Sequence, residues 1–153
     1  MNTQTMSLPD EAATMALGAE LAQVLKTPMV IYLEGDLGAG KTTLTRGLLR
    51  GLGHAGPVKS PTYAIVESYE LAPITIHHFD LYRFSDPEEW LDAGLVDLFD
   101  ERSVCLIEWP AQGAGFLPDP DWVVSLSVQN QGRTCTIIAK SLLGKECLNT
   151  WLN

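Results

Sequence analysis

Basic residues are scarce in this chain of 153 residues. It holds 10 Lys and Arg against 19 Asp and Glu, which gives a formal net charge of −9. Because no basic run is long enough to follow a phosphate backbone, the chain is not expected to bind nucleic acid by itself. If its function involves nucleic acid, a partner must therefore supply most of the contacts.

Long apolar runs are also lacking. No window holds eighteen consecutive apolar residues, and residues 1–6 have neither the basic start nor the apolar core of a secretion signal. We therefore expect a cytoplasmic protein without a membrane partner. The length suits a single domain over residues 1–153, since the chain can bury a proper core but divides poorly into two.

Cysteine is rare as well. Cys105, Cys135 and Cys147 are odd in number and show no Cys-x-x-Cys spacing, which argues against both a disulfide framework and a zinc site. We expect the three thiols to act as small apolar fillers of the core.

The most informative feature of the sequence is a glycine-rich segment. Residues Gly35–Thr42 spell G-x-x-x-x-G-K-S/T, directly after the apolar run 29–33 and directly before a predicted helix. This is the pattern of a phosphate-binding P-loop, in which successive backbone N–H groups and the N-terminus of the helix converge on an anion. Lys41 is expected to reach the β- and γ-phosphates, and Thr42 to offer its hydroxyl to Mg²⁺.

Hydrophobic periodicity and turn residues predict the remaining elements. Ser7 and Asp10 are spaced as a capping box, so the first helix is expected to begin near Ser7. Helices are predicted over 7–26, 41–52 and 141–152, with a short one from 86 that Gly94 interrupts; strands over 29–33 and 104–107; and hairpins over 63–71 with 74–82 and 122–129 with 134–139. The set predicts an α/β, P-loop NTPase-like three-layer domain with a mixed parallel and antiparallel sheet.

Three polar residues lie at predicted strand ends or in a loop facing them. Glu108 follows four apolar residues, as expected of an acid that orients Mg²⁺ or polarises the attacking water; the alternative is a carboxylate facing solvent. Asp80 is a second candidate for the metal or the water, or else a hairpin residue paired with Arg83. Thr62, in Ser-Pro-Thr-Tyr, lies either in a switch-like loop that reaches the γ-phosphate or in an ordinary turn.

Three other residues are open to two interpretations. His77 and His78 are adjacent on a predicted strand and therefore point to opposite faces, so they should not share a metal; we expect one to be buried and one exposed. Trp109, directly after Glu108, is a candidate nucleotide contact or simply a core residue.

Four motifs in order carry a family resemblance: Gly-Asp-Leu-Gly-Ala-Gly-Lys-Thr-Thr (35–43), Ser-Pro-Thr-Tyr (60–63), His-Phe-Asp-Leu-Tyr-Arg (78–83) and Glu-Trp-Pro (108–110). Together they resemble the TsaE family, formerly YjeE, over about residues 8–139. The resemblance implies a Mg²⁺-dependent ATPase that binds ATP and ADP. It also implies that the chain acts with the TsaB–TsaD complex in threonylcarbamoyladenosine modification of tRNA, which it meets only through these partners. ATP hydrolysis would be weak alone, stimulated by the partners, and would reset the complex.

The resemblance also implies roles for particular residues. Thr42 and Glu108 would hold Mg²⁺, Asp80 would belong to the metal shell or contact the attacking water, and Thr62 would form the γ-phosphate switch. The implied phosphate contacts are Leu37, Gly38, Ala39, Gly40, Lys41, Thr42 and Thr43, and the implied adenine contacts are Glu11, Thr14 and Arg133. From the sequence alone, the last three are expected to be solvated surface residues.

Two other functions are compatible with a P-loop. A small-molecule kinase usually has an arginine-bearing lid, whereas the five arginines of this chain are scattered. A non-catalytic docking module would need ATP for binding but would tolerate loss of its acids. Specificity for GTP is disfavoured because no Asn-Lys-x-Asp segment is present.

Overall fold

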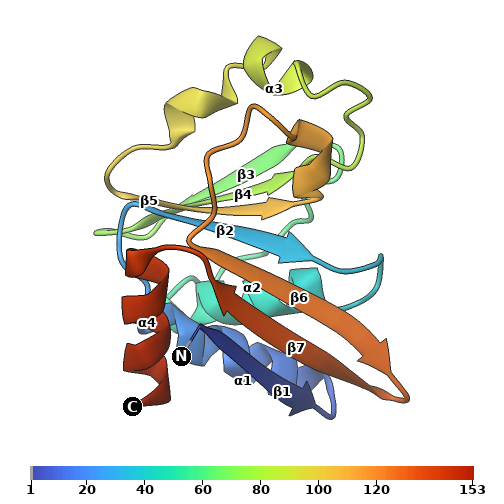
Figure 1. Cartoon of the computed structure of the whole chain (residues 1–153), viewed down its shortest axis with the longest axis vertical. Helices are drawn as coiled ribbons and strands as arrows, with labels where there is room; N and C mark the ends of the chain where they lie inside the picture. The colour runs from blue at the N-terminus through green and yellow to red at the C-terminus, as the bar shows by residue number, and fades with distance from the viewer. Residues whose placement is uncertain (1) are drawn as a thin grey trace.

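The computed structural model describes residues 2–153, which form a seven-stranded mixed sheet with helices on both faces (Figure 1). The strands are β1 (Thr3–Leu8), β2 (Met29–Glu34), β3 (Val66–Glu70), β4 (Thr75–Asp80), β5 (Ser103–Glu108), β6 (Trp122–Gln129) and β7 (Gly132–Ala139). The helices are α1 (Glu11–Ala22), α2 (Lys41–Gly51), α3 (Glu89–Asp92) and α4 (Leu142–Leu152), with 3₁₀ turns η1 (Leu95–Leu98) and η2 (Pro110–Gly113).

The strand order is β1-β7-β6-β2-β5-β4-β3. The four central strands β6, β2, β5 and β4 run parallel, whereas β1, β7 and β3 join antiparallel at the two sides. The carboxyl ends of β2, β4 and β5 therefore meet at one edge of the sheet. This edge is where α/β folds bind ligands.

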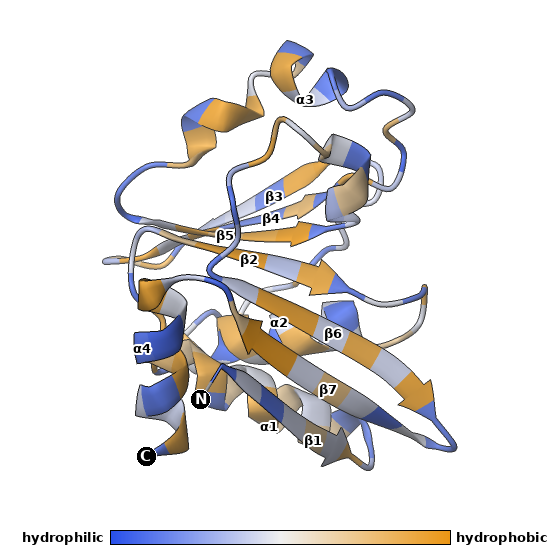
Figure 2. Ribbon diagram, in the orientation of Figure 1, coloured by the Kyte–Doolittle hydropathy of each residue, from blue (hydrophilic) through white to orange (hydrophobic). Residues whose placement is uncertain are grey.

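Alternate residues of β2 enter two separate apolar clusters, one on each face of the sheet. Met29, Ile31 and Leu33 pack with α1, α2 and α4, whereas Val30 and Tyr32 pack toward the cluster around α3. Figure 2 shows β2 and β5 as largely apolar and the outer strand β1 as more polar. A strand covered on both faces is expected to be apolar throughout, and β2 fits that pattern.

Helices α1 and α2 approach each other closely beneath the P-loop. A Cβ atom at Gly47 of α2 would overlap the backbone of Met15 in α1, so only glycine fits at that position. This contact fixes α2, and with it the P-loop at its N-terminus, against the rest of the domain.

The predicted fold class is confirmed, but the predicted start of the first helix is wrong. Ser7 belongs to β1, which pairs antiparallel with β7, and α1 begins after Asp10, whose carboxylate accepts a hydrogen bond from the backbone N–H of Ala13 at 2.8 Å. The physical reason is the two-residue alternation in Thr3–Leu8, where only the even positions are covered. This alternation is typical of a strand with one face on the core.

The first hairpin is shorter than predicted: its strands cover Val66–Glu70 and Thr75–Asp80. The expectation that one of two adjacent histidines is exposed is wrong, because His77 and His78 are both buried. They do point to opposite faces, but β4 is covered on both. Burial lowers the pKa of His77, whose Nδ1 lies 2.6 Å from the Ser68 hydroxyl.

The three cysteines are free and buried, as predicted. Burial raises the pKa of Cys105 and of Cys135 to about 12, so both are neutral thiols in the core. Within residues 2–153, no helix is both long enough and apolar enough to cross a membrane.

A candidate nucleotide-binding site

A cavity of about 560 Å³ lies at the carboxyl ends of the parallel strands. Its volume falls in the range of pockets that take small ligands and cofactors. Most residues singled out from the sequence line it: Glu11, Thr14, Leu37, Gly38, Gly40, Lys41, Thr42, Thr43, Thr62, Asp80, Glu108 and Arg133.

The floor of the cavity is the P-loop between β2 and α2. Gly40 has φ 108°, a left-handed conformation that side chains rarely adopt, and it directly precedes the first residue of α2. The backbone can therefore turn sharply enough to aim the free N–H groups of the helix N-terminus into the cavity. These groups and the helix dipole favour an anion there.

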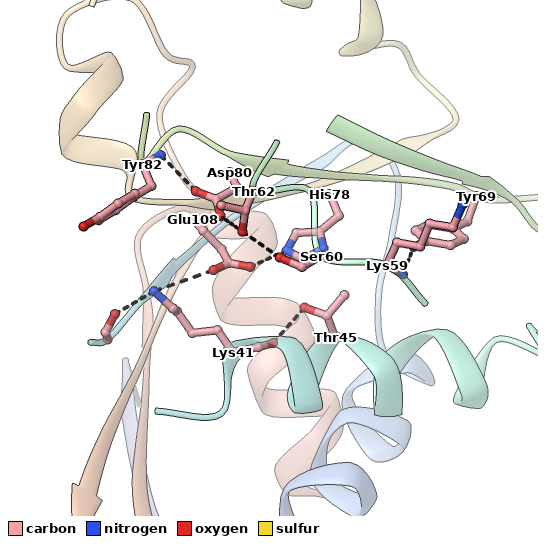
Figure 3. Close-up of polar contacts among 11 residues, drawn as sticks. Lys41, Thr45, Lys59, Ser60, Thr62, Tyr69, His78, Asp80, Tyr82 and Glu108 are labelled. Carbon is pink, nitrogen blue, oxygen red and sulfur yellow. Dashed lines mark hydrogen bonds and ion pairs between the residues drawn. The ribbon is translucent and has the colours of Figure 1, made fainter. Parts of the chain in front are cut away.

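Lys41 is the cation at the centre of this floor, and it is 5% exposed. Its Nζ donates to the backbone carbonyl oxygen of Gly35 at 2.6 Å and lies 3.6 Å from Oε1 of Glu108 (Figure 3). The same nitrogen lies 4.3 Å from the centre of the Trp109 ring. The ammonium is thus held beside the cavity by a carbonyl, a carboxylate and an aromatic face.

Asp80 ends β4 beside Glu108 at the end of β5, since the two residues are paired in the sheet register. Asp80 Oδ1 accepts from the backbone N–H of Tyr82 at 2.9 Å, and Oδ2 accepts from the Thr62 hydroxyl at 3.1 Å. Because the single hydroxyl proton of Thr62 is used there, the Ser60 hydroxyl donates to Thr62 at 2.8 Å. The loop that carries Thr62 is therefore tied to a strand-end acid, and Asp80 forms no ion pair with Arg83.

Glu108 is held from a second side by His78. The His78 Nε2 lies 2.5 Å from Glu108 Oε2, and both side chains are buried (Figure 3). The proposed alternative of a carboxylate facing solvent is therefore wrong, because the Glu108 side chain is only 6% exposed.

Arg133 reaches the P-loop from the start of β7. Its Nε donates to the carbonyl oxygen of Ala39 at 3.0 Å and its Nη2 to that of Gly38 at 3.1 Å. The guanidinium thus braces the loop backbone while it also lines the cavity. Its contact with adenine stays a prediction.

The first turn of α1 forms the wall near Arg133. Leu8 at the end of β1 is paired with Arg133 in the register of the sheet, which brings Glu11 and Thr14 to this wall. Thr14 is 2% exposed, so the expectation of a solvated surface residue is wrong for it. Glu11 is exposed as expected and lies 3.8 Å from Arg46.

Two of the predicted contacts lie outside this cavity. Ala39 is buried in the core, and only its backbone can face a phosphate. Trp109, a non-glycine residue at φ 57°, lines a second cavity of about 220 Å³ on the other side of Lys41. Its indole packs at 4.9 Å from the ring of Tyr82, so it combines core packing with contact to Lys41.

Several residues of the site were not found from the sequence. They are Pro9, Asp10, Ser60, Gln131 and Gly132, which line the cavity, and His78, which contacts Glu108. Pro9 and Asp10 reach the cavity because β1 pairs with β7, which the prediction of a helix from Ser7 concealed. The alternation in Thr3–Leu8 is the signal that would have indicated β1. Gln131 and Gly132 lie at the turn between β6 and β7, in a hairpin that was predicted without being connected to the site.

The donor set suits Mg²⁺ only when phosphate completes it. Thr42, Asp80 and Glu108 offer hydroxyl and carboxylate oxygens, which are the ligands that Mg²⁺ prefers. Within residues 2–153, no group of three or more His, Cys, Asp or Glu side chains could hold a metal by itself. Nucleotide-binding sites commonly hold Mg²⁺ through one or two protein ligands, water and substrate phosphates, so the residues present fit this ion.

Comparison with known proteins gives consistent matches. The profile of the family described as "Threonylcarbamoyl adenosine biosynthesis protein TsaE" matches residues 8–135. The tRNA threonylcarbamoyladenosine biosynthesis protein TsaE of Haemophilus influenzae is 45% identical over 158 aligned positions, covering all of both chains. The protein of the same name from Bacillus subtilis is 44% identical over 101 residues, which cover 66% of this chain and 61% of that one. The crystal structure of Bacillus subtilis YdiB superposes with a TM-score of 0.82 at 28% identity, over 98% of this chain and 94% of that chain.

Proposed function

The chain belongs to the TsaE family, and on that premise we propose that it is a Mg²⁺-dependent ATPase that serves the formation of N6-threonylcarbamoyladenosine (t6A) at position 37 of tRNAs that read ANN codons. In this proposal it acts with the TsaB–TsaD complex in the cytoplasm. It does not itself transfer the threonylcarbamoyl group; its ATP hydrolysis resets the complex between turnovers.

The ATPase proposal rests on three charged side chains that line one cavity: Lys41, Asp80 and Glu108. Lys41 from the P-loop lies 3.6 Å from Glu108, and Asp80 is paired with Glu108 across the ends of β4 and β5. A P-loop alone binds phosphate, whereas hydrolysis also requires groups that orient water and balance the charge that develops on the γ-phosphate. Two buried carboxylates beside the P-loop supply the first requirement, and Lys41 supplies the second.

The role proposed for each residue follows from its position in the cavity. The N–H groups at the start of α2 and the Lys41 ammonium would hold the phosphates, and Thr42, with Glu108 and Asp80, would hold Mg²⁺. The bound ion would neutralise phosphate charge and help to align the reacting oxygens. Thr62 would respond to the γ-phosphate, since a phosphate oxygen that accepts a hydrogen bond from its hydroxyl would replace the 3.1 Å hydrogen bond to Asp80.

In the proposed reaction, water attacks the γ-phosphorus while the bond from that phosphorus to the β,γ-bridging oxygen breaks. ADP and inorganic phosphate are the products. Glu108 is the residue that orients the water, because its carboxylate is fixed on one side and open to the cavity on the other. Turnover without partners is expected to be slow, since the cavity lacks an arginine that is free to reach the γ-phosphate: Arg133 alone of the five arginines lines it, and it is committed to the P-loop carbonyls.

The net charge of −9 supports indirect action on tRNA. A surface of that sign repels a phosphate backbone, so the tRNA contacts belong to the partner proteins.

The decisive experiment measures ATP hydrolysis by the purified chain, alone and with TsaB–TsaD, beside a Lys41→Ala control. Strong stimulation that the control lacks would support the ATPase and its site together. No hydrolysis under either condition, combined with ATP-dependent binding to TsaB–TsaD that survives Glu108→Gln, would instead identify a docking module. Transfer of phosphate to a metabolite would identify a kinase.

A further inference from the structure

His78 has an arrangement that the P-loop and the strand-end acids do not require. It is fully buried on β4, and its Nε2 lies 2.5 Å from Oε2 of Glu108. Its other ring nitrogen, Nδ1, is buried and has no hydrogen-bond partner among residues 2–153. A buried imidazole with one nitrogen unpartnered is costly, so a purely structural role would be better served by an apolar residue.

The register of the sheet explains why these two side chains meet. His78 is paired with Leu106, and Glu108 is two residues further along β5 on the same face. That face packs against α2, whose first residue is Lys41. The next residue on β4 in each direction, His77 or Phe79, points to the opposite face and cannot reach Glu108.

The contact also fixes the direction of the hydrogen bond. A carboxylate can only accept, so His78 Nε2 carries a proton and donates a hydrogen bond to Oε2. Oε1, the other oxygen of Glu108, is the one on the side of Lys41, at 3.6 Å from its Nζ.

We propose that His78 is a positioning residue for ATP turnover: its Nε2–H holds Oε2 of Glu108 so that Oε1 stays aimed at Lys41 and the cavity. The proposal rests on the proposed function, because Glu108 must act in hydrolysis for its orientation to matter. His78 touches no substrate atom, and its effect passes entirely through Glu108.

Glutamine and leucine at position 78 test this role. The amide nitrogen of glutamine can occupy the place of His78 Nε2, whereas leucine fills the space without a donor. We expect His78→Gln to keep partner-stimulated kcat within threefold of the unaltered chain and His78→Leu to lower it at least tenfold. Both should keep ATP affinity within threefold. Normal kcat in His78→Leu, or equal loss in both variants, would overturn the proposal.

The neighbouring histidine provides the matched control. His77 is also buried on the same strand but contacts Ser68 instead of Glu108, so His77→Leu should leave kcat unchanged. A similar loss in His77→Leu would show that burial of a histidine in β4, and not contact with Glu108, determines activity. In a Glu108→Ala background, His78→Leu should have no further effect on kcat; a further tenfold loss there would refute action through Glu108.

A readout without turnover completes the test. In the nucleotide-free protein, ¹⁵N-labelled His78 should show a protonated Nε2, and the Nε2–H resonance should shift in Glu108→Ala. The opposite tautomer, or no shift, would exclude the proposed contact. If the unaltered chain hydrolyses no ATP while the resonance behaves as expected, the contact stands and the proposed function fails instead.

Discussion

Replacing Glu108 by glutamine should separate ATP binding from ATP turnover. The amide has nearly the same volume, and its oxygen can still accept the hydrogen bond from His78. The substitution therefore removes the negative charge while the site keeps its shape. Because the charge orients water and the shape holds phosphate, the two functions should respond differently.

The ion pair between Glu108 and Lys41 determines how the substitution should affect ATP binding. At 3.6 Å, the gross attraction between the two charges is about 5 kcal/mol at an effective dielectric constant of ~20. A triphosphate competes with Glu108 for the same ammonium. Without the carboxylate this competition disappears, so Glu108→Gln should bind ATP at least as tightly as the unaltered chain. Turnover should fall about a hundredfold or more, as is usual when a group that handles a proton or a water is removed.

Two assays distinguish these effects. Isothermal titration with ATP in EDTA measures affinity without any metal contact of Glu108, and phosphate release with Mg²⁺ and TsaB–TsaD measures turnover. Glu34→Gln is the matched control, since it removes an exposed acid at the end of β2 and should change neither quantity. An ATP affinity weakened more than tenfold in Glu108→Gln, or unchanged turnover, would refute the reasoning.

Three further predictions concern the P-loop, the helix pair and the buried thiols. Arg133→Gln removes the two guanidinium hydrogen bonds to P-loop carbonyls, so ATP should bind about tenfold more weakly. The amide hydrogen of Ala39, which is bonded to the carbonyl oxygen of Asp36, should exchange faster, and unchanged exchange would contradict the bracing role. Gly47→Ala forces a Cβ against the backbone of Met15 and should lower the free energy of unfolding by about 1–3 kcal/mol in urea denaturation followed by tryptophan fluorescence. Burial raises the pKa of Cys105 and of Cys135 to about 12, so the unfolded chain loses these two protons at a lower pH than the folded chain does. The free energy of unfolding should therefore keep its full value below about pH 9. Above that pH it should fall by about 1.4 kcal/mol per pH unit for each thiol. The double variant Cys105→Ala/Cys135→Ala should lose the part of the alkaline slope that these two thiols supply and keep the part due to Cys147 and Tyr32, whose pKa values burial also raises.

Much of the site could be predicted from the sequence because its chemistry is local. The P-loop is a continuous segment between a strand and a helix, and Asp80 and Glu108 are each the last residue of a buried strand. In a parallel sheet, residues at carboxyl ends share one edge whatever the order of the strands, so these groups could be brought together without knowledge of the topology. The family resemblance added the adenine contacts, which remain predictions.

The parts that the sequence did not reveal depend on pairing between distant segments. Arg133 braces the P-loop because β7 pairs with β6 and β6 with β2, whose end leads into the loop. Helix α1 lines the cavity because β1 pairs with β7, and a six-residue outer strand with one covered face gives a weak signal beside a strong capping pattern. The contact of His78 with Glu108 likewise requires the register of β4 on β5, since a shift by one residue would put His77 in its place. The register of β4 on β5 therefore decides which of the two buried histidines contacts Glu108. For this reason, the variants at positions 77 and 78 test the strand register as directly as they test the proposed role of His78.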